Sequence, residues 1–245
     1  RHLGVDETSR RRGHHYAALF CDLGRAKLLF ATEGKDASTF ARFRADFVAH
    51  GGDPEKLLEL CMDMSPAFLL GAQQHLSEPA LTFDRYHLLQ NLNFALDQVR
   101  RQEQQGSPGL KQSRYRWLRN PGKLSDRQRS ELERLAARHR RTGRAYRIKL
   151  AFQELYRQLP EDAEEHLSRW YAWAIRSRLA PIVQFARSIA THWDGVLRWF
   201  TSQVSNGILE AIGSLIQAAK RRARGYRTTE NLIAIAYLIA GKLDF

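Results

Sequence analysis

The chain has 245 residues, of which 43% are hydrophobic and 27% are charged. This length and balance predict a globular protein with one sizeable core, or one core with an inserted subdomain. The 39 Lys and Arg residues outnumber the 26 Asp and Glu residues, for a net charge of +13, which favours a polyphosphate partner such as nucleic acid. No apolar stretch is long enough to span a bilayer, and no signal peptide is visible, so we expect no membrane contact and a cytoplasmic location.

The two cysteines, Cys21 and Cys61, lie in apolar strand-like runs. Neither has the Cys-x-x-Cys or Cys/His spacing that holds zinc, so we expect two buried free thiols in a reducing compartment. The sequence starts at Arg1 and enters a strand within a few residues. We interpret this start as that of a fragment whose N-terminal portion is missing.

The first hundred residues carry an α/β pattern. Strands are predicted around Asp6, over 15–22 and 26–32 with a turn at Gly24, over 57–62 and over 80–83. Helices are predicted over 36–50, 65–75 and 85–101. Three strands followed by alternating helices and strands is the ribonuclease-H-like order. We therefore expect an α/β fold with a ribonuclease-H-like mixed sheet.

The chain changes character after residue 101. Residues 111–200 show no convincing strand pattern, and breaks near Pro121, Gly143, Pro160 and Pro181 separate helical stretches. We predict that residues 1–101 form the first part of the core, that 102–200 form an all-helical insertion subdomain, and that 201–245 form C-terminal core helices.

A basic stretch runs through the predicted insertion. Residues 114–149 hold thirteen Lys or Arg against three Asp or Glu, with Tyr115, Trp117 and Tyr146 interleaved. One interpretation is a solvated helical face, and the other is a surface that follows phosphates and stacks aromatic rings on bases. We favour nucleic-acid contact.

Three acids stand at positions that suggest catalysis. Asp6 lies in the first predicted strand, Asp63 ends an apolar run, and Glu210 lies on a helix far downstream. Carboxylates at the ends of buried strands are costly unless they bind something, and two divalent cations are a common answer.

The helix that carries Glu210 has two faces. Its predicted buried stripe consists of Ile208, Ile212, Leu215, Ile216 and Ala219. Glu210 lies on a different face, together with Asn206, Gly213 and Gln217. It can therefore face the two aspartates.

Several motifs in this order resemble the DDE transposases of bacterial insertion sequences, specifically the ISL-three group. The matching stretches are Val5-Asp6-Glu7-Thr8-Ser9, Gly13-His14-His15-Tyr16, Met62-Asp63-Met64-Ser65, Phe83-Asp84-Arg85-Tyr86-His87, Ala95-Leu96-Asp97-Gln98-Val99-Arg100, and Ser205-Asn206-Gly207 with Lys220-Arg221-Arg222-Ala223-Arg224-Gly225-Tyr226-Arg227. Together they cover most of the chain apart from the helical insert.

The resemblance implies a DDE transposase catalytic domain, with its ribonuclease-H-like core interrupted by a helical insertion before the last acid. It implies that Asp6, Asp63 and Glu210 hold two Mg²⁺ ions, which Mn²⁺ can replace, for phosphodiester hydrolysis at transposon ends and strand transfer into target DNA. It further implies double-stranded DNA as partner, a homodimer that pairs two ends, and a place beside the bacterial nucleoid.

The second acid has an alternative, because Asp84 also ends a strand. The second acid of this fold follows the fourth strand, which favours Asp63. Asp84 and His87 then match an Asp-x-x-His signature of related groups, and with Asn206 they are expected to orient the site or contact DNA. Alternatively, His87 is a helix-cap or core histidine.

Two basic groups are expected to bind the DNA backbone. They are Lys220, Arg221, Arg222, Arg224 and Arg227 after the last acid, and Arg10, Arg11 and Arg12 after the first strand. An alternative for the first group is favourable charge at a helix C-terminus.

The chain departs from the family in two places. Residues 1–245 do not supply the N-terminal zinc-binding and helix-turn-helix region that recognises transposon ends in full-length members, and Gly213 stands where we expect the group to have Asn.

Two alternatives remain beside the transposase. One is a ribonuclease-H-like nuclease without strand transfer, because both reactions use the same metals and the three acids cannot separate them. The other is a catalytically silent DNA-binding relative, for which Gly213 leaves room.

Overall fold

The computed structural model describes residues 2–11, 13, 15–204 and 206–242. The chain forms two compact units. Residues 1–85 and 202–245 make up the first, the sheet unit, and residues 86–201 make up the second, the helical unit. The division predicted from the sequence is different, because it placed residues 86–101 with the core. The predicted domain boundaries stay a prediction.

The sheet unit is built on five strands in the order β3-β2-β1-β4-β5. β1 pairs antiparallel with β2, and β2 with β3, whereas β1–β4 and β4–β5 are parallel pairs. The strands are β1 (His2–Arg11), β2 (His15–Asp22), β3 (Lys27–Glu33), β4 (Glu59–Met62) and β5 (Ala80–Phe83). This mixed sheet confirms the α/β class and is compatible with a ribonuclease-H-like fold.

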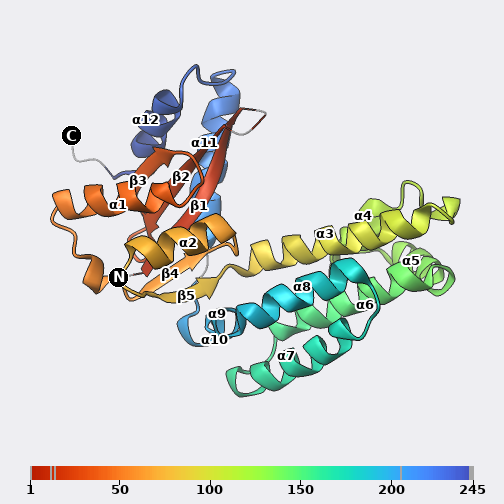
Figure 1. Cartoon of the computed structure of the whole chain (residues 1–245). Helices are drawn as coiled ribbons and strands as arrows, with labels where there is room; N and C mark the ends of the chain where they lie inside the picture. Colours follow the sequence, from red (N-terminus) through yellow and green to blue (C-terminus); the bar gives the residue numbers. More distant parts are fainter. Residues whose placement is uncertain (1, 12, 14, 205, 243–245) are drawn as a thin grey trace. The chain divides into compact units, whose positions relative to one another are not determined.

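Two pairs of helices cover the two faces of the sheet, α1 and α2 on one and α11 and α12 on the other (Figure 1). They are α1 (Ser38–Ala49), α2 (Pro66–His75), α11 (Gly207–Arg222) and α12 (Thr229–Ala240), and a short 3₁₀ turn, η1 (Pro54–Lys56), precedes β4. The alternation of β2 sorts its side chains between the faces. Leu19 and Cys21 pack with α11 and α12, whereas Phe20 contacts α1.

The α1 face is held by aromatic rings. Phe20 stacks on Phe43 with ring centroids 4.4 Å apart, and Phe40 meets Phe20 edge to face at 5.2 Å. All three side chains are fully buried. They are the centre of this half of the core.

The buried stripe of α11 differs from the predicted one. Leu209, Ile212 and Ile216 are buried, whereas Leu215 is 57% exposed. The prediction for Leu215 was therefore wrong. Apolar residues lie on several neighbouring faces of this helix, and only the elements that pack against it decide which face is buried. Cys21 and Cys61 are buried free thiols, as predicted.

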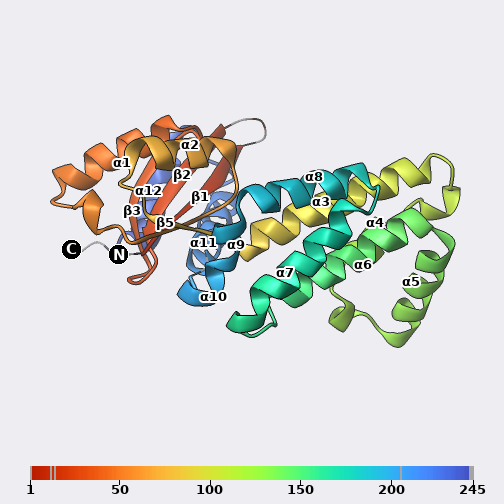
Figure 2. The ribbon, with the colours of Figure 1, turned by 60° about the horizontal axis from the view of Figure 1, so that its bottom comes forward.

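The helical unit is made of α3 to α10, and none of the described residues from 86 to 201 is in a strand. α6 packs against α5 and α7, and α7 against α8 (Figure 2). The helices are α3 (Arg85–Gln104), α4 (Arg114–Leu118), α5 (Asp126–Arg138), α6 (Arg140–Leu155), α7 (Pro160–Ile175), α8 (Ala180–Thr191), α9 (Trp193–Leu197) and α10 (Trp199–Ser202), with 3₁₀ turns η2 (Pro108–Leu110) and η3 (Pro121–Lys123). No helix among the described residues is long and apolar enough to cross a bilayer.

Two of the three aromatic residues in the basic stretch belong to the core of the helical unit. Trp117 is 0% exposed and donates from Nε1 to Ser113 Oγ at 3.0 Å, and Tyr146 is 8% exposed. The predicted stacking of these two rings on bases is therefore wrong. Only Tyr115, which is 70% exposed, is available at the surface.

A buried lysine fixes α4. Lys149 is 1% exposed, and its Nζ donates to the carbonyl oxygens of Trp117 and Leu118 at 2.9 and 3.0 Å. These carbonyls belong to the end of α4, where no helical N–H groups follow to satisfy them. Burial lowers the pKa of Lys149 to about 8.

The aromatic stack predicts a large and local loss of stability. Phe43→Ala should lower the free energy of unfolding of the sheet unit by about 3–5 kcal/mol, because it leaves a cavity beside Phe20. Val48→Ala, on the same helix at 49% exposure, should change it by less than about 0.5 kcal/mol. Both cysteines lie in the sheet unit, so thiol labelling in urea measures its unfolding. Equal midpoints for the two variants would contradict the prediction.

The buried lysine predicts a pH dependence. Between pH 8 and 10.5 the unfolded chain binds more protons than the folded one, because the folded pKa of Lys149 is lowered from 10.5 to about 8. The stability of the wild type relative to Lys149→Met should therefore rise across this interval, by up to roughly 3 kcal/mol.

Tryptophan fluorescence in urea measures this change, since all five tryptophans lie in the helical unit. Lys111→Met, at an exposed position of the same unit, is the control and should show no such trend. A pH-independent difference for Lys149→Met would refute the assignment.

Candidate active site

Asp6 and Asp63 come from neighbouring parallel strands. The parallel register pairs Gly4 of β1 with Cys61 of β4. Asp6 lies two residues after Gly4 within β1, and Asp63 directly follows Met62, the last residue of β4. Asp6 Oδ1 accepts from the backbone N–H of Glu7, and Asp63 Oδ1 from that of Ser65, both at 2.8 Å. Both aspartates are half-buried.

Glu210 lies in the first turn of α11, which packs against β1. The approach of the two elements is close at Gly4, where a Cβ would stand 2.7 Å from Leu209 Cδ1. The absence of a side chain at Gly4 therefore permits α11 to begin beside β1. Glu210 is half-buried, and its backbone N–H donates to Asn206 O at 2.8 Å.

Asp84 and Asn206 connect the start of α11 to the sheet. Asp84 follows β5, is 2% exposed, and accepts the backbone N–H of Asn206 on Oδ2 at 2.7 Å. Asn206 is fully buried, and its Nδ2 donates to Val5 O at 3.2 Å. Asn206 Oδ1 has no hydrogen-bond partner within the described part of the chain. Asp84 therefore holds the start of the helix that carries Glu210. The role predicted for Asp84 and Asn206, to orient the site or contact DNA, stays a prediction.

Negative charge gathers around the buried thiols. Burial is the main cause that raises the pKa of Cys61, and the charges of Asp84, Glu59 and Asp6 raise it further. Burial likewise raises the pKa of Cys21 to about 12, with contributions from Asp6 and Asp22. The middle of β1 and the end of β5 therefore share an acidic environment, and neither thiol ionises near neutral pH.

The donor set fits a hard cation in its chemistry, since Mg²⁺ prefers carboxylate oxygens. Within the described ranges, however, no three His, Cys, Asp or Glu side chains are grouped closely enough to hold a metal ion. Asp6, Asp63 and Glu210 thus come from adjacent elements without forming a complete metal centre, and their role as ligands stays a prediction.

His87 belongs to the helical unit, where it is half-buried in the first turn of α3. Its ring meets that of Tyr86 edge to face, with centroids 5.6 Å apart. Its predicted role near the acids stays a prediction.

Two of the predicted DNA-binding side chains are engaged within the protein. Arg10 is 8% exposed, and its Nη1 donates to Arg227 O at 2.7 Å. Lys220 Nζ donates to Ser9 O at 2.6 Å, beside Gln217, whose Nε2 donates to the same oxygen at 2.8 Å. Burial and the charge of Arg221 lower the pKa of Lys220. These contacts hold the end of β1 against α11 and the segment that follows it. The sequence did not predict them, although the alternation of side chains along β1 places Arg10 on the same face of the strand as Thr8, which is buried.

The remaining predicted DNA contacts are exposed where the structure describes them. Arg221, Arg222, Arg224 and Arg227 follow one another at and after the end of α11, and all four are exposed. Arg11 is exposed too, with its guanidinium 2.7 Å from His15 Nε2. Arg12 lies outside the described residues. DNA contact by these side chains stays a prediction.

Comparison with known proteins points to one family. The model of the ISL-three group of DDE transposases, described as a transposase, matches residues 3–236. The chain is 26% identical over 267 residues to the transposase for insertion sequence element IS1557 of Mycobacterium tuberculosis, which covers 97% of this chain and 60% of the relative.

A second relative is the transposase for insertion sequence element IS1001 of Bordetella parapertussis. It is 26% identical over 238 residues, covering 94% of this chain and 58% of the relative. The chain thus spans about three-fifths of the length of the curated relatives that it matches.

Gly213 and Gly4 predict opposite effects of added side chains. A Cβ at Gly213 would meet no heavy atom within 4 Å, so Gly213→Ala should raise the free energy of unfolding by about 0.5–1 kcal/mol through reduced backbone entropy. Gly4→Ala should lower it, because its Cβ would stand 2.6 Å from Leu23 Cδ2. Thiol labelling in urea measures both. A destabilised Gly213→Ala protein would show a requirement for glycine that packing does not explain.

Proposed function

We propose, since this chain belongs to the ISL-three family of DDE transposases, that it carries the catalytic centre of a transposase. The reaction is hydrolysis of a phosphodiester at a transposon end, followed by attack of the freed 3′-hydroxyl on target DNA. The observation that carries the proposal is the origin of the three acids. They come from β1, from the end of the neighbouring parallel strand β4, and from the first turn of the helix packed on β1.

Asp6, Asp63 and Glu210 are the proposed ligands of two Mg²⁺ ions, which Mn²⁺ can replace. When bound, the ions supply activation of the attacking oxygen and stabilisation of the leaving oxygen. Asp84 and Asn206 hold the first turn of α11 in place, so that Glu210 is presented on a fixed backbone. Asp84 is 2% exposed and accepts from Asn206 N, whereas Asp63 is half-buried, and this difference in accessibility supports Asp63 as the second ligand.

The four exposed arginines after α11 are the proposed contacts to DNA phosphates at this site. Arg221, Arg222, Arg224 and Arg227 carry positive charge on the same helix that carries Glu210, or just after it. Arg10 and Lys220 fix the adjoining backbone by their bonds to Arg227 and Ser9. The proposed partners are double-stranded transposon ends and target DNA, held by a homodimer at the bacterial nucleoid.

The acid assignment predicts that conservative changes at the proposed ligands and at Asp84 have different effects on activity. Asp63→Asn and Glu210→Gln should lower metal-dependent nicking of transposon-end DNA by roughly 10³-fold or more, since each removes a charged ligand whose contribution is several kcal/mol. Asp84→Asn keeps an oxygen that accepts from Asn206 N and should retain most activity. The measurement is nicking and joining of labelled end DNA with Mg²⁺ or Mn²⁺.

Several outcomes would change the proposal. An active Asp63→Asn protein beside an inactive Asp84→Asn protein would move the second ligand to Asp84. Nicking by the wild type without joining would favour a nuclease. Binding of DNA without nicking in either metal would mean that the chain is catalytically silent by itself.

A further inference from the structure

Positive charge is concentrated in one segment of the helical unit. Residues 111–147 hold thirteen Lys and Arg against three Asp and Glu, and all thirteen of these basic side chains are exposed. Residues 154–169 of the same unit hold two against five. A face that merely needs to be solvated requires no such separation of charge, whereas a surface for a polyanion does.

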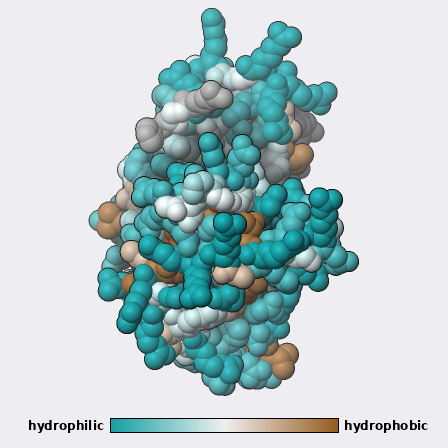
Figure 3. All heavy atoms as spheres, turned by 90° about the vertical axis from the view of Figure 1, so that its right-hand side faces the viewer, coloured by the Kyte–Doolittle hydropathy of each residue, from teal (hydrophilic) through white to brown (hydrophobic). Residues whose placement is uncertain are grey.

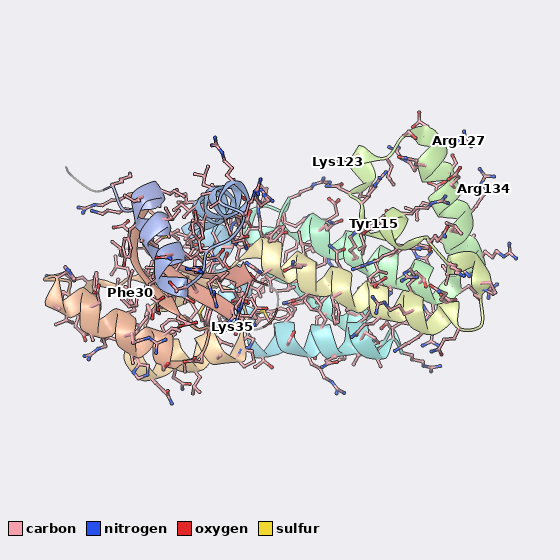
Figure 4. All side chains as sticks on the ribbon, turned by 90° about the horizontal axis from the view of Figure 1, so that it is seen from above. Phe30, Lys35, Tyr115, Lys123, Arg127 and Arg134 are labelled. Carbon is pink, nitrogen blue, oxygen red and sulfur yellow. The ribbon has the colours of Figure 1, made fainter. Side chains whose placement is uncertain are left out.

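Three of these cations form a stripe on α5. Arg127, Arg134 and Arg138 are seven and four residues apart, so they lie on one face of the helix along about 16 Å. α5 is a surface helix, because only Leu132 of its thirteen residues is buried. Figure 4 shows Arg127 and Arg134 pointing away from the other helices of the unit, with Lys123 labelled just before α5.

One acid lies within the stripe and connects it to α4. Glu131 is 3.4 Å from Arg127 and 3.4 Å from Arg116, measured between nitrogen and carboxylate oxygen. One carboxylate shared by two guanidinium groups leaves a net positive charge. It orients Arg116 of α4 beside the α5 stripe, so the cations of two helices act on the same side.

An exposed aromatic ring lies among these cations. Tyr115 is 70% exposed, with the Arg114 guanidinium 5.9 Å from its ring centroid. Trp117, two residues away, is fully buried in the core of the helical unit. Tyr115 therefore stays at the surface although an aromatic side chain of the same short helix packs in the core. The Tyr115 hydroxyl is a donor of the kind that contacts phosphate oxygens.

The backbone beneath this surface is held rigidly. Lys149 binds the carbonyl oxygens of Trp117 and Leu118, which lie between Arg116 and the next cation, Arg119. The capping box of Ser125 and Gln128 fixes the start of α5. Binding through this surface should therefore cost little backbone conformational entropy.

We propose that the helical unit has its own surface for the backbone of double-stranded DNA, made of Tyr115, Arg116, Arg127, Arg134 and Arg138. This surface, the α4–α5 basic surface, is distinct from the arginines that follow α11 on the sheet unit. In the view from the helical unit's side, hydrophilic side chains dominate the face (Figure 3), as binding of a polyanion without base reading requires. The inference rests on the proposed function only in taking DNA as the polyanion.

The test compares two variants of the full chain with equal changes in net charge. The first carries Arg127→Gln, Arg134→Gln and Arg138→Gln. The control carries Arg157→Gln, Arg169→Gln and Arg176→Gln, at exposed positions of the same unit outside the basic segment. Fluorescence anisotropy with a duplex of arbitrary sequence, over a range of salt concentrations, measures the affinity and its salt dependence.

The first variant should bind at least about tenfold more weakly at low salt, and the slope of log affinity against log salt should fall by about 2–3. The control should stay within about twofold of the wild type. Tyr115→Phe should weaken binding severalfold through loss of the hydroxyl. Equal losses in both triple variants, or no loss in the first, would overturn the proposal.

Two further readouts separate this result from other failures. Tryptophan fluorescence in urea checks that the helical unit of each variant is folded. Nicking at DNA concentrations below saturation should fall in parallel with the affinity, because the first variant loses phosphate contacts while its acids are unchanged. If the first variant binds DNA more weakly but the wild type does not nick DNA, this surface remains supported and only the proposed chemistry is refuted.

Discussion

The bonds of Asn206 hold the sheet unit together at the point where the chain leaves it and returns. The chain departs after Asp84 and comes back before Asn206, 122 residues later, and the carboxylate of Asp84 accepts the backbone N–H of Asn206. The side-chain amide of Asn206 reaches the carbonyl of Val5 on the central strand. Both bonds are buried, where a lost partner costs about 1–3 kcal/mol. The position of α11, and with it Glu210, depends on them, as does the closure of the long excursion.

Close packing reinforces this link. Gly4 has no side chain, so Leu209 of α11 approaches the backbone of β1, and Ile212 and Ile216 continue the contact into the core formed with β2 and α12. At the far end of the strand, Lys220 and Gln217 donate to Ser9 O. The helix that carries the last acid is thus tied to the central strand at both of its ends, by hydrogen bonds and apolar packing.

The basic residues serve two physical purposes, and burial separates them. Arg10 and Lys149 are buried and Lys220 is half-buried. All three donate to backbone carbonyls, which gives them the partners that a charge removed from water requires. The exposed cations after α11 and on the α4–α5 basic surface contribute to the high net positive charge of the chain. The same residue types therefore stabilise the fold in one environment and create a polyanion-binding surface in the other.

The order of the strands along the chain and the helical character of residues 86–201 followed from the sequence, because alternation, helical spacing and turn residues are local properties. The burial of Trp117 and Tyr146, the exposure of Leu215 and the engagement of Arg10 did not. Each depends on which neighbour packs against that face, and a neighbour distant in sequence leaves no local pattern. The sequence by itself determined which residues are candidates for the proposed chemistry. Only the tertiary structure decided which of the polar residues are buried and which reach the surface, since hydrogen bonds such as that between Asp84 and Asn206 join residues more than a hundred positions apart.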